Sequence, residues 1–302
     1  FYQIGVGVGS MALYEAAMKL GFNSLTGIEI SNQESRGLVG NKEWAAKGRG
    51  WGLPGTTPWI PEDIASASIG QAVVQVTPLQ LARAYAVFAN GGYLVEPSFI
   101  DKIQDRYGKI LFRKDNRVCK NCTFDYESFS DKSLKNLTIY PNIVENRKRV
   151  ISEESAYQMT SFLMGVIKRG TAKNINFLDF QVAGKTGTTN DNQDAWFIGY
   201  NSEITVGVYV GFDKPKTLGI SETGSKVAAP IFGSFMKEAY NNSRPYPFKR
   251  PDGVKYINVD IKTGEPSNKN SIQEVFKKDF SFDEKSNIPL PSEQDNDRRG
   301  FY

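Results

Sequence analysis

The sequence predicts an α+β fold in which helices flank an antiparallel sheet. Residues 180–189, 195–200 and 204–212 are rich in β-branched and aromatic residues and are separated by Asn-Asp and Asn-Ser turns. Turns this short imply that consecutive strands run antiparallel. Segments with helical periodicity and recognisable caps lie before and after these strands.

The expected helices are defined by their end signals. Thr77 is a suitable N-cap, Pro78 fits the first helical position, and Gln80 stands where a capping box places Glu or Gln. Asn90-Gly91-Gly92 ends this helix. Three further helices are expected at residues 10–20 with Ser10 as the cap, 152–170 with Ser152 as the cap, and 230–240 beginning at Pro230.

Three other segments break this pattern. Residues 26–64 are rich in Gly, Pro and Trp without a sustained period, which predicts a long, partly ordered excursion. Residues 98–115 alternate enough to predict a β-ribbon that turns at 106–109. The polar composition of residues 116–146 predicts a surface insertion.

The expected organisation is one partial domain with an extension. Residues 1–240 carry the periodic segments, whereas 241–302 are Pro-rich and charged, and we expect residues 266–302 to be flexible. The chain opens on Phe1 within apolar, Gly-rich sequence, so we expect it to be a piece of a longer protein whose N-terminal part is missing here.

Composition excludes several kinds of function. Lys and Arg total 37 against 33 Asp and Glu, and the two signs are interspersed, which disfavours nucleic acid as a partner. The chain has no histidine, which excludes a Ser-His-Asp triad, an imidazole base and a His-based metal site within it. We expect no cofactor and no metal. No apolar run approaches the roughly 20 residues of a membrane span, so any anchor is expected outside the chain.

The two cysteines, Cys119 and Cys122, form a Cys-x-x-Cys pair in basic, polar sequence. Zinc normally requires four ligands, and a redox motif would open a helix after a strand. The pair therefore predicts a short-loop disulfide or two free thiols, with redox chemistry as a weaker alternative.

Residues 182–189, Val-Ala-Gly-Lys-Thr-Gly-Thr-Thr, allow two interpretations. A phosphate-binding loop would need Gly at position 179, which is Asp179, and a helix opening at Lys185. The alternative is the Lys-Thr-Gly strand of penicillin-recognising serine enzymes. On an edge strand, Lys185, Thr186 and Thr188 could face one anionic substrate, Gly187 would allow close approach, and a backbone N–H beside Gly187 or Thr188 could bind an oxyanion.

The chain contains a second copy of the tripeptide, Lys262-Thr263-Gly264, followed by Glu265-Pro266. This context predicts a turn. The nucleophile motif Ser-x-x-Lys occurs once, at Ser234–Lys237, after the strand motif rather than before it, and its spacing also fits two neighbours on an amphipathic helix. Ser-x-Asn does not occur in the chain.

Several short segments together resemble one known family. They are Ile69-Gly70-Gln71, residues 77–82 and 89–92, Ala156-Tyr157-Gln158, Arg169-Gly170-Thr171-Ala172, and residues 184–189, 194–197 and 210–213. In this combination, residues 1–265 resemble the C-terminal portion of a penicillin-binding protein transpeptidase domain. Segments 1–3 and 26–29 look like class B enzymes, whereas 103–109, 119–122 and 223–230 look like class A enzymes. The chain is thus class A-like from about residue 98 onward and class B-like before it.

The resemblance implies a β-lactamase/transpeptidase-like fold and a D,D-transpeptidase that cross-links peptidoglycan stem peptides ending in D-Ala-D-Ala. It assigns substrate binding to Lys185, Thr186, Gly187 and Thr188. The acylated serine and its Lys base would lie upstream of this chain, so the fragment alone is expected to be inactive. β-Lactam antibiotics would trap that serine.

The resemblance also implies a setting and leaves alternatives. We expect the periplasmic side of the bacterial inner membrane, with other cell-wall synthesis proteins as conceivable partners. The alternatives are a β-lactam hydrolase or D,D-carboxypeptidase with the same strand motif, and a non-catalytic sensor of muropeptides or β-lactams.

Overall fold

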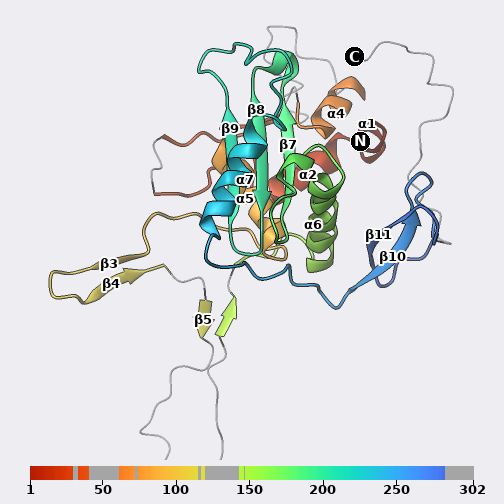
Figure 1. Cartoon of the computed structure of the whole chain (residues 1–302). Helices are drawn as coiled ribbons and strands as arrows, with labels where there is room; N and C mark the ends of the chain where they lie inside the picture. The colour runs from red at the N-terminus through yellow and green to blue at the C-terminus, as the bar shows by residue number, and fades with distance from the viewer. Residues whose placement is uncertain are drawn as a thin grey trace, which may run out of the picture.

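The computed structural model describes residues 1–29, 33–40, 61–71, 74–114, 117–119, 143–145 and 147–282 (Figure 1). Most of the predicted 116–146 insertion, including Cys122, lies outside the described residues, so the state of the Cys119–Cys122 pair stays a prediction. The same holds for part of the 26–64 excursion and for residues 283–302.

The centre of the molecule is the antiparallel sheet β7-β8-β9. Its strands are β7 (Ala183–Thr188), β8 (Ala195–Tyr200) and β9 (Thr205–Val210), which confirms the three predicted strands, with β8 as predicted and β7 and β9 shorter. Within the described part of the chain, β7 pairs only with β8 and therefore lies at an edge of the sheet, as predicted.

One face of the sheet is covered by α7 (Ala228–Ala239) (Figure 1). This helix begins two residues before the predicted Pro230, and its Phe232 packs against Phe197 of β8 with ring centroids 4.8 Å apart. Both rings are fully buried. The core on this face also contains Ile167, Ala172, Ile175, Val182, Ala195, Ala228, Ala229 and Met236.

The opposite face is covered by α5 (Pro78–Ala89) and α6 (Glu153–Lys168). A Cβ at Gly207 of β9 would lie 3.8 Å from Ala82 Cβ, which shows how closely α5 approaches the sheet. Tyr200 is buried here beside α6, and its hydroxyl bonds to the Thr160 hydroxyl at 2.9 Å. Burial raises the pKa of Tyr200, so it stays a neutral core residue.

The predicted caps of α5 and α6 are confirmed. Thr77 accepts a hydrogen bond from the Gln80 N–H, and the Gln80 side chain accepts one from the Thr77 N–H, which completes the capping box. Gln80 is also buried and donates to the carbonyls of Ser24 and Arg36, both at 2.8 Å. Its side chain thus fixes the start of α5 to the backbone at Ser24 and at Arg36.

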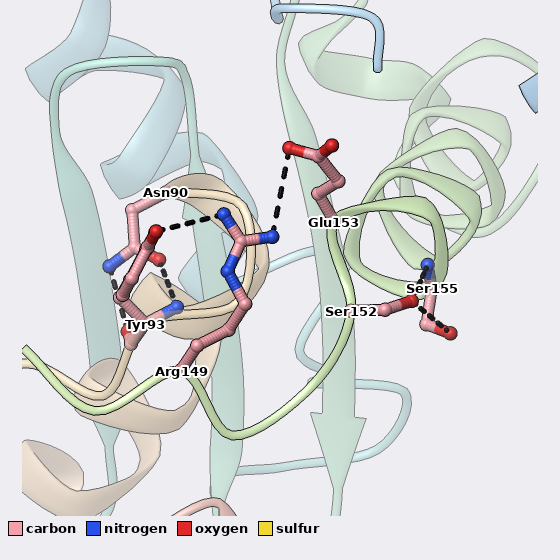
Figure 2. Close-up of polar contacts among 6 residues, drawn as sticks. All are labelled: Asn90, Tyr93, Arg149, Ser152, Glu153 and Ser155. Carbon is pink, nitrogen blue, oxygen red and sulfur yellow. Dashed lines mark hydrogen bonds and ion pairs between the residues drawn. The ribbon is translucent and has the colours of Figure 1, made fainter. Parts of the chain in front are cut away.

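The end of α5 and the start of α6 are tied together by polar contacts (Figure 2). Asn90 exchanges side-chain hydrogen bonds with the backbone of Tyr93, while Arg149 donates to the Tyr93 hydroxyl at 2.9 Å and pairs with Glu153 at 3.6 Å. Ser152 caps α6 by accepting from the Ser155 N–H at 3.2 Å. These contacts hold both helices on the same face of the sheet.

Two helices near the N-terminus were not predicted from sequence. They are α1 (Tyr2–Val8) and α4 (Pro61–Ser68), which lie against each other. The predicted helix α2 (Ser10–Lys19) forms, but its N-cap is Gly9, so the assignment of Ser10 as the cap was wrong. The reason is that α1 ends at Val8 and Gly9, with a φ of 85°, separates the two helices and becomes the N-cap of α2.

The C-terminal segment holds a correction. Residues 266–302 were expected to be flexible, but residues 271–277 form strand β11 (Ser271–Lys277), which pairs with β10 (Val254–Asp260) in an antiparallel hairpin, and residues 283–302 lie outside the described residues. The hairpin is fixed because Val254 and Val275 are buried and because Gln158 of α6 donates to the Val275 carbonyl at 3.1 Å.

The remaining strands form three short pairs. The predicted ribbon is β3 (Lys102–Gln104) with β4 (Ile110–Arg113), and it projects away from the sheet and its helices (Figure 1). The other pairs are β1 (Leu38–Val39) with β2 (Val74–Gln75), and β5 (Arg117–Cys119) with β6 (Ile143–Glu145). Among the described residues, no helix is long and apolar enough to cross a membrane, and no cluster of three potential metal ligands occurs.

Candidate functional site

The backbone of β7 is presented at an open edge. The Thr189 N–H donates to the Asp194 carbonyl at 3.1 Å, and the Asn201 N–H donates to the Ile204 carbonyl at 3.1 Å. In an antiparallel ladder, residues that exchange hydrogen bonds with the neighbouring strand alternate with residues that do not, and both of these bonds indicate the same set of bonded residues. The N–H and C=O groups of Thr186 and Thr188 therefore point away from β8, toward the edge that carries no strand among the described residues.

Lys185 brings a positive charge to this edge. Its Nζ donates to the outward carbonyl of Thr186 at 2.8 Å, so the ammonium group turns back along the strand. Desolvation by surrounding protein lowers the pKa of Lys185. No carboxylate contacts this ammonium group among the described ion pairs and hydrogen bonds. The charge remains available to an anion.

The side chains of the motif divide between the two faces of the sheet. Lys185 and Gly187 stand opposite Ile198 and Trp196 and share the α5 side, whereas Thr186 lies opposite Phe197 and shares the α7 side with Thr188. The sequence-based hypothesis placed Lys185, Thr186 and Thr188 toward one substrate. Because of the alternation, one ligand can meet all three only at the edge of β7.

The two threonine hydroxyls each have a partner from a neighbouring loop. Thr186 Oγ1 lies 2.8 Å from Thr171 Oγ1, at the end of α6. Thr188 Oγ1 accepts a hydrogen bond of 3.0 Å from the Gly224 N–H, just before α7. Sequence reasoning assigned no role to Thr171 or Gly224, although both belong to segments that carried the family resemblance.

Glycine is required where β7 packs tightly. A Cβ at Gly184 would lie 2.6 Å from Phe197 Cζ and 2.9 Å from the Ile198 carbonyl oxygen. Gly184 lies within β7, so this close packing occurs inside the strand. Lys185 continues in extended conformation and opens no helix, which excludes the phosphate-loop interpretation.

Loops before β8 and before α7 complete the surroundings of β7. Asp194 donates its N–H to Thr189 Oγ1 at 2.8 Å and accepts from the Tyr209 hydroxyl at 2.8 Å. This carboxylate bond raises the pKa of Tyr209. A Cβ at Gly224 would lie 2.3 Å from the Gly187 carbonyl oxygen, so the loop before α7 rests directly on the strand.

Comparison with known proteins identifies the family. A family model described as the penicillin-binding protein transpeptidase domain matches residues 1–237. The chain belongs to this transpeptidase family. It is 43% identical over 217 residues to penicillin-binding protein 1A of Rickettsia bellii, covering 72% of this chain and 26% of that protein. It is 34% identical over 238 residues to penicillin-binding protein 1A of Pseudomonas aeruginosa, covering 70% and 29%. The chain thus spans little more than a quarter of these relatives.

Solved structures of penicillin-binding proteins share the fold. The crystal structure of penicillin-binding protein 1A from Haemophilus influenzae aligns with a TM-score of 0.57 at 31% identity, over 72% of this chain and 36% of that chain. Penicillin-binding protein A from Mycobacterium tuberculosis, solved as a ceftriaxone acyl-enzyme complex, aligns with a TM-score of 0.55 at 21% identity, over 79% and 45%. The predicted family and α+β transpeptidase-like fold are confirmed.

In this penicillin-binding protein domain, the one Ser-x-x-Lys lies away from the strand motif. Ser234 and Lys237 are exposed on α7, on the side opposite the buried Phe232 and Met236. Their surroundings match two neighbours on the outer face of an amphipathic helix. The edge of β7 thus presents hydrogen-bond donors but has no serine of this motif beside it.

Proposed function

We propose that the chain is part of a peptidoglycan D,D-transpeptidase and that β7 forms one wall of its substrate site. The observation that carries this proposal is the open edge of β7. It presents the Lys185 ammonium group, the hydroxyls of Thr186 and Thr188 and their outward N–H groups. Each of these groups can donate a hydrogen bond, which suits an anionic peptide end.

Each group has a defined task in this proposal. The Lys185 ammonium group attracts the terminal carboxylate of the D-Ala-D-Ala stem peptide or the carboxylate of a β-lactam. Thr186 and Thr188 donate to that carboxylate or to a substrate carbonyl. The outward Thr188 N–H is placed to stabilise the oxyanion of a tetrahedral intermediate, and Gly187 leaves room for the substrate backbone.

The covalent step requires a serine from outside these 302 residues. That serine attacks the penultimate D-Ala carbonyl, the terminal D-Ala leaves, and an amine of a neighbouring stem peptide takes the acyl group. A β-lactam carbonyl is attacked in the same way and stays bound to the serine. The reaction takes place in the bacterial cell envelope, on the periplasmic side of the inner membrane.

A labelled β-lactam tests the missing nucleophile. The 302-residue chain is expected to form no covalent adduct, because its one Ser-x-x-Lys faces solvent on α7. Intact-protein mass spectrometry measures this directly. An adduct on Ser234 would contradict the proposed arrangement.

The role of β7 is tested in the product of the complete gene. Lys185→Ala is expected to slow acylation by about 10- to 100-fold, the effect of losing a charge-assisted hydrogen bond. Lys262→Ala and Thr263→Val, in the second copy of the tripeptide, are matched controls that should acylate at the normal rate. Rapid β-lactam turnover without a persistent acyl-enzyme would favour a hydrolase, and absence of acylation in the complete protein would favour a sensor.

A further inference from the structure

The two hydroxyls of β7 share a pattern that the motif itself does not predict. Thr188 Oγ1 accepts a hydrogen bond from the Gly224 N–H, which uses one of its two acceptor lone pairs. Its O–H can still donate to a ligand. Thr186 Oγ1 is within hydrogen-bond distance of Thr171 Oγ1, 2.8 Å away, where either hydroxyl can be the donor.

We propose that Thr171 is a positioning residue that donates to Thr186 and so keeps the Thr186 O–H directed at the carboxylate of the ligand. Thr171 acts on Thr186 as the Gly224 N–H acts on Thr188. A ligand carboxylate can only accept hydrogen bonds, so it selects the arrangement in which Thr171 is the donor. This inference rests on the proposed substrate-binding role of β7.

The backbone around Thr171 is held firmly enough for this task. Ala172 is fully buried, and its N–H donates to the Val166 carbonyl at 3.1 Å. A Cβ at Gly170 would lie 2.8 Å from Val166 Cα, so the chain passes closely over the end of α6. Thr171 therefore sits on a fixed turn although its side chain is exposed.

A second set of bonds joins this turn to the loop before α7. Ser225 donates its hydroxyl to the Thr171 carbonyl, and Asn174 donates its side-chain N–H to the Ser225 carbonyl at 2.7 Å. Gly224, next to Ser225, is the residue that binds Thr188. The partners of both β7 hydroxyls thus belong to one connected network, and this gives the segments 169–172 and 223–225 a shared role.

The physical effect is pre-organisation. A threonine hydroxyl without a partner rotates and exchanges bonds with water, and fixing it on ligand binding costs free energy. An acceptor bond already made in the free protein removes part of that cost. The benefit applies to ligands that carry a carboxylate and is absent for ligands that do not.

The test uses the complete gene product and two probes, benzylpenicillin and its methyl ester. Thr171→Val removes the hydroxyl with little change of shape and is expected to raise the half-saturating concentration of benzylpenicillin by about 2- to 10-fold, the effect of one hydrogen bond. Acylation by the ester is expected to change less than 2-fold. Thr171→Ser keeps a hydroxyl and is expected to restore the value for benzylpenicillin.

A double variant separates this inference from the proposed function. If Thr171 acts through Thr186, Thr171→Val combined with Thr186→Val should be no weaker than Thr186→Val alone. If Thr186→Val has an unchanged half-saturating concentration of benzylpenicillin, the proposed role of β7 is overturned. If this concentration rises for Thr186→Val but not for Thr171→Val, or if Thr171→Val affects benzylpenicillin and its methyl ester equally, only the positioning role is overturned. Thr217→Val, with unchanged benzylpenicillin kinetics, controls for loss of an exposed hydroxyl.

Discussion

The same tripeptide occurs at two places in this molecule and has two structures. Lys185-Thr186-Gly187 is extended in β7, with the buried rings of Phe197 and Phe232 beneath its sheet. Lys262-Thr263-Gly264 forms the exposed turn between β10 and β11, where the Asp260 carboxylate accepts the Lys262 N–H at 2.8 Å and Gly264 has a φ of 73°.

The contrast shows that the residues flanking a short motif decide whether its hydrogen-bonding groups line a strand edge or close a turn. In β7 the motif continues as Thr-Thr and pairs residue by residue with β8. After Gly264 come Glu265 and Pro266, and the Glu265 carbonyl accepts the Asp260 N–H at 2.8 Å, which closes the turn. The first copy presents backbone and side-chain donors along an edge, and the second uses its N–H groups to close a turn.

The largest expected effect comes from removing the support beneath the first copy. Phe232→Ala deletes a fully buried ring that packs 4.8 Å from Phe197, and it should lower the free energy of unfolding by about 3–5 kcal/mol. Ile261→Ala, beside the second copy, removes a side chain that is 64% exposed and should change stability by less than about 0.5 kcal/mol. Urea denaturation measures both, and equal losses would contradict the contrast.

A smaller effect is expected when a methyl group is added at a glycine near each copy. Gly184→Ala would place Cβ 2.6 Å from Phe197 Cζ, and this overpacking should cost about 1–3 kcal/mol of global stability. Gly264→Ala meets no atom within 4 Å, so it should cost only the strain of its positive φ, about 1 kcal/mol.

Hydrogen exchange separates these two glycine variants by location. Faster exchange is expected throughout β7 and β8 for Gly184→Ala, and only within the β10–β11 hairpin for Gly264→Ala. Exchange that spreads across the central sheet in the second variant would show that the hairpin is part of the same cooperative unit.

What the sequence predicted follows the range of the interactions involved. The capping box of Thr77 and Gln80 and the three strands of the sheet depend on residues within a few positions of one another, and they were found. The hairpin β10–β11 depends on contacts with α6, more than 100 residues earlier in the chain for the bond from Gln158 to Val275, and it was missed.

The same reasoning applies to the helices and to the site. Helix α1 contains two glycines and packs against α4, where a Cβ at Gly5 would lie 2.3 Å from Ser68 Cβ, so its formation depends on a tertiary contact. Lys185 to Thr188 could be proposed from their local pattern. Their division between the faces of the sheet, and the partners Thr171 and Gly224, required the folded arrangement.

The smallest expected effect concerns the charge of Lys185 in the first copy. Desolvation lowers its pKa below the ordinary value of 10.5. At pH values between the lowered pKa and 10.5, the unfolded chain therefore binds more protons than the folded protein. The free energy of unfolding should therefore gain a small increment as pH rises through that window. Lys185→Gln should abolish this increment. Lys262→Gln removes one charge from the second copy and should leave the midpoint of the Lys185 titration unchanged. The midpoint is measured from the Lys185 Cε chemical shift, assigned by comparison with Lys185→Gln. A midpoint at or above 10.5 would contradict the desolvation of the Lys185 ammonium group at the edge of β7.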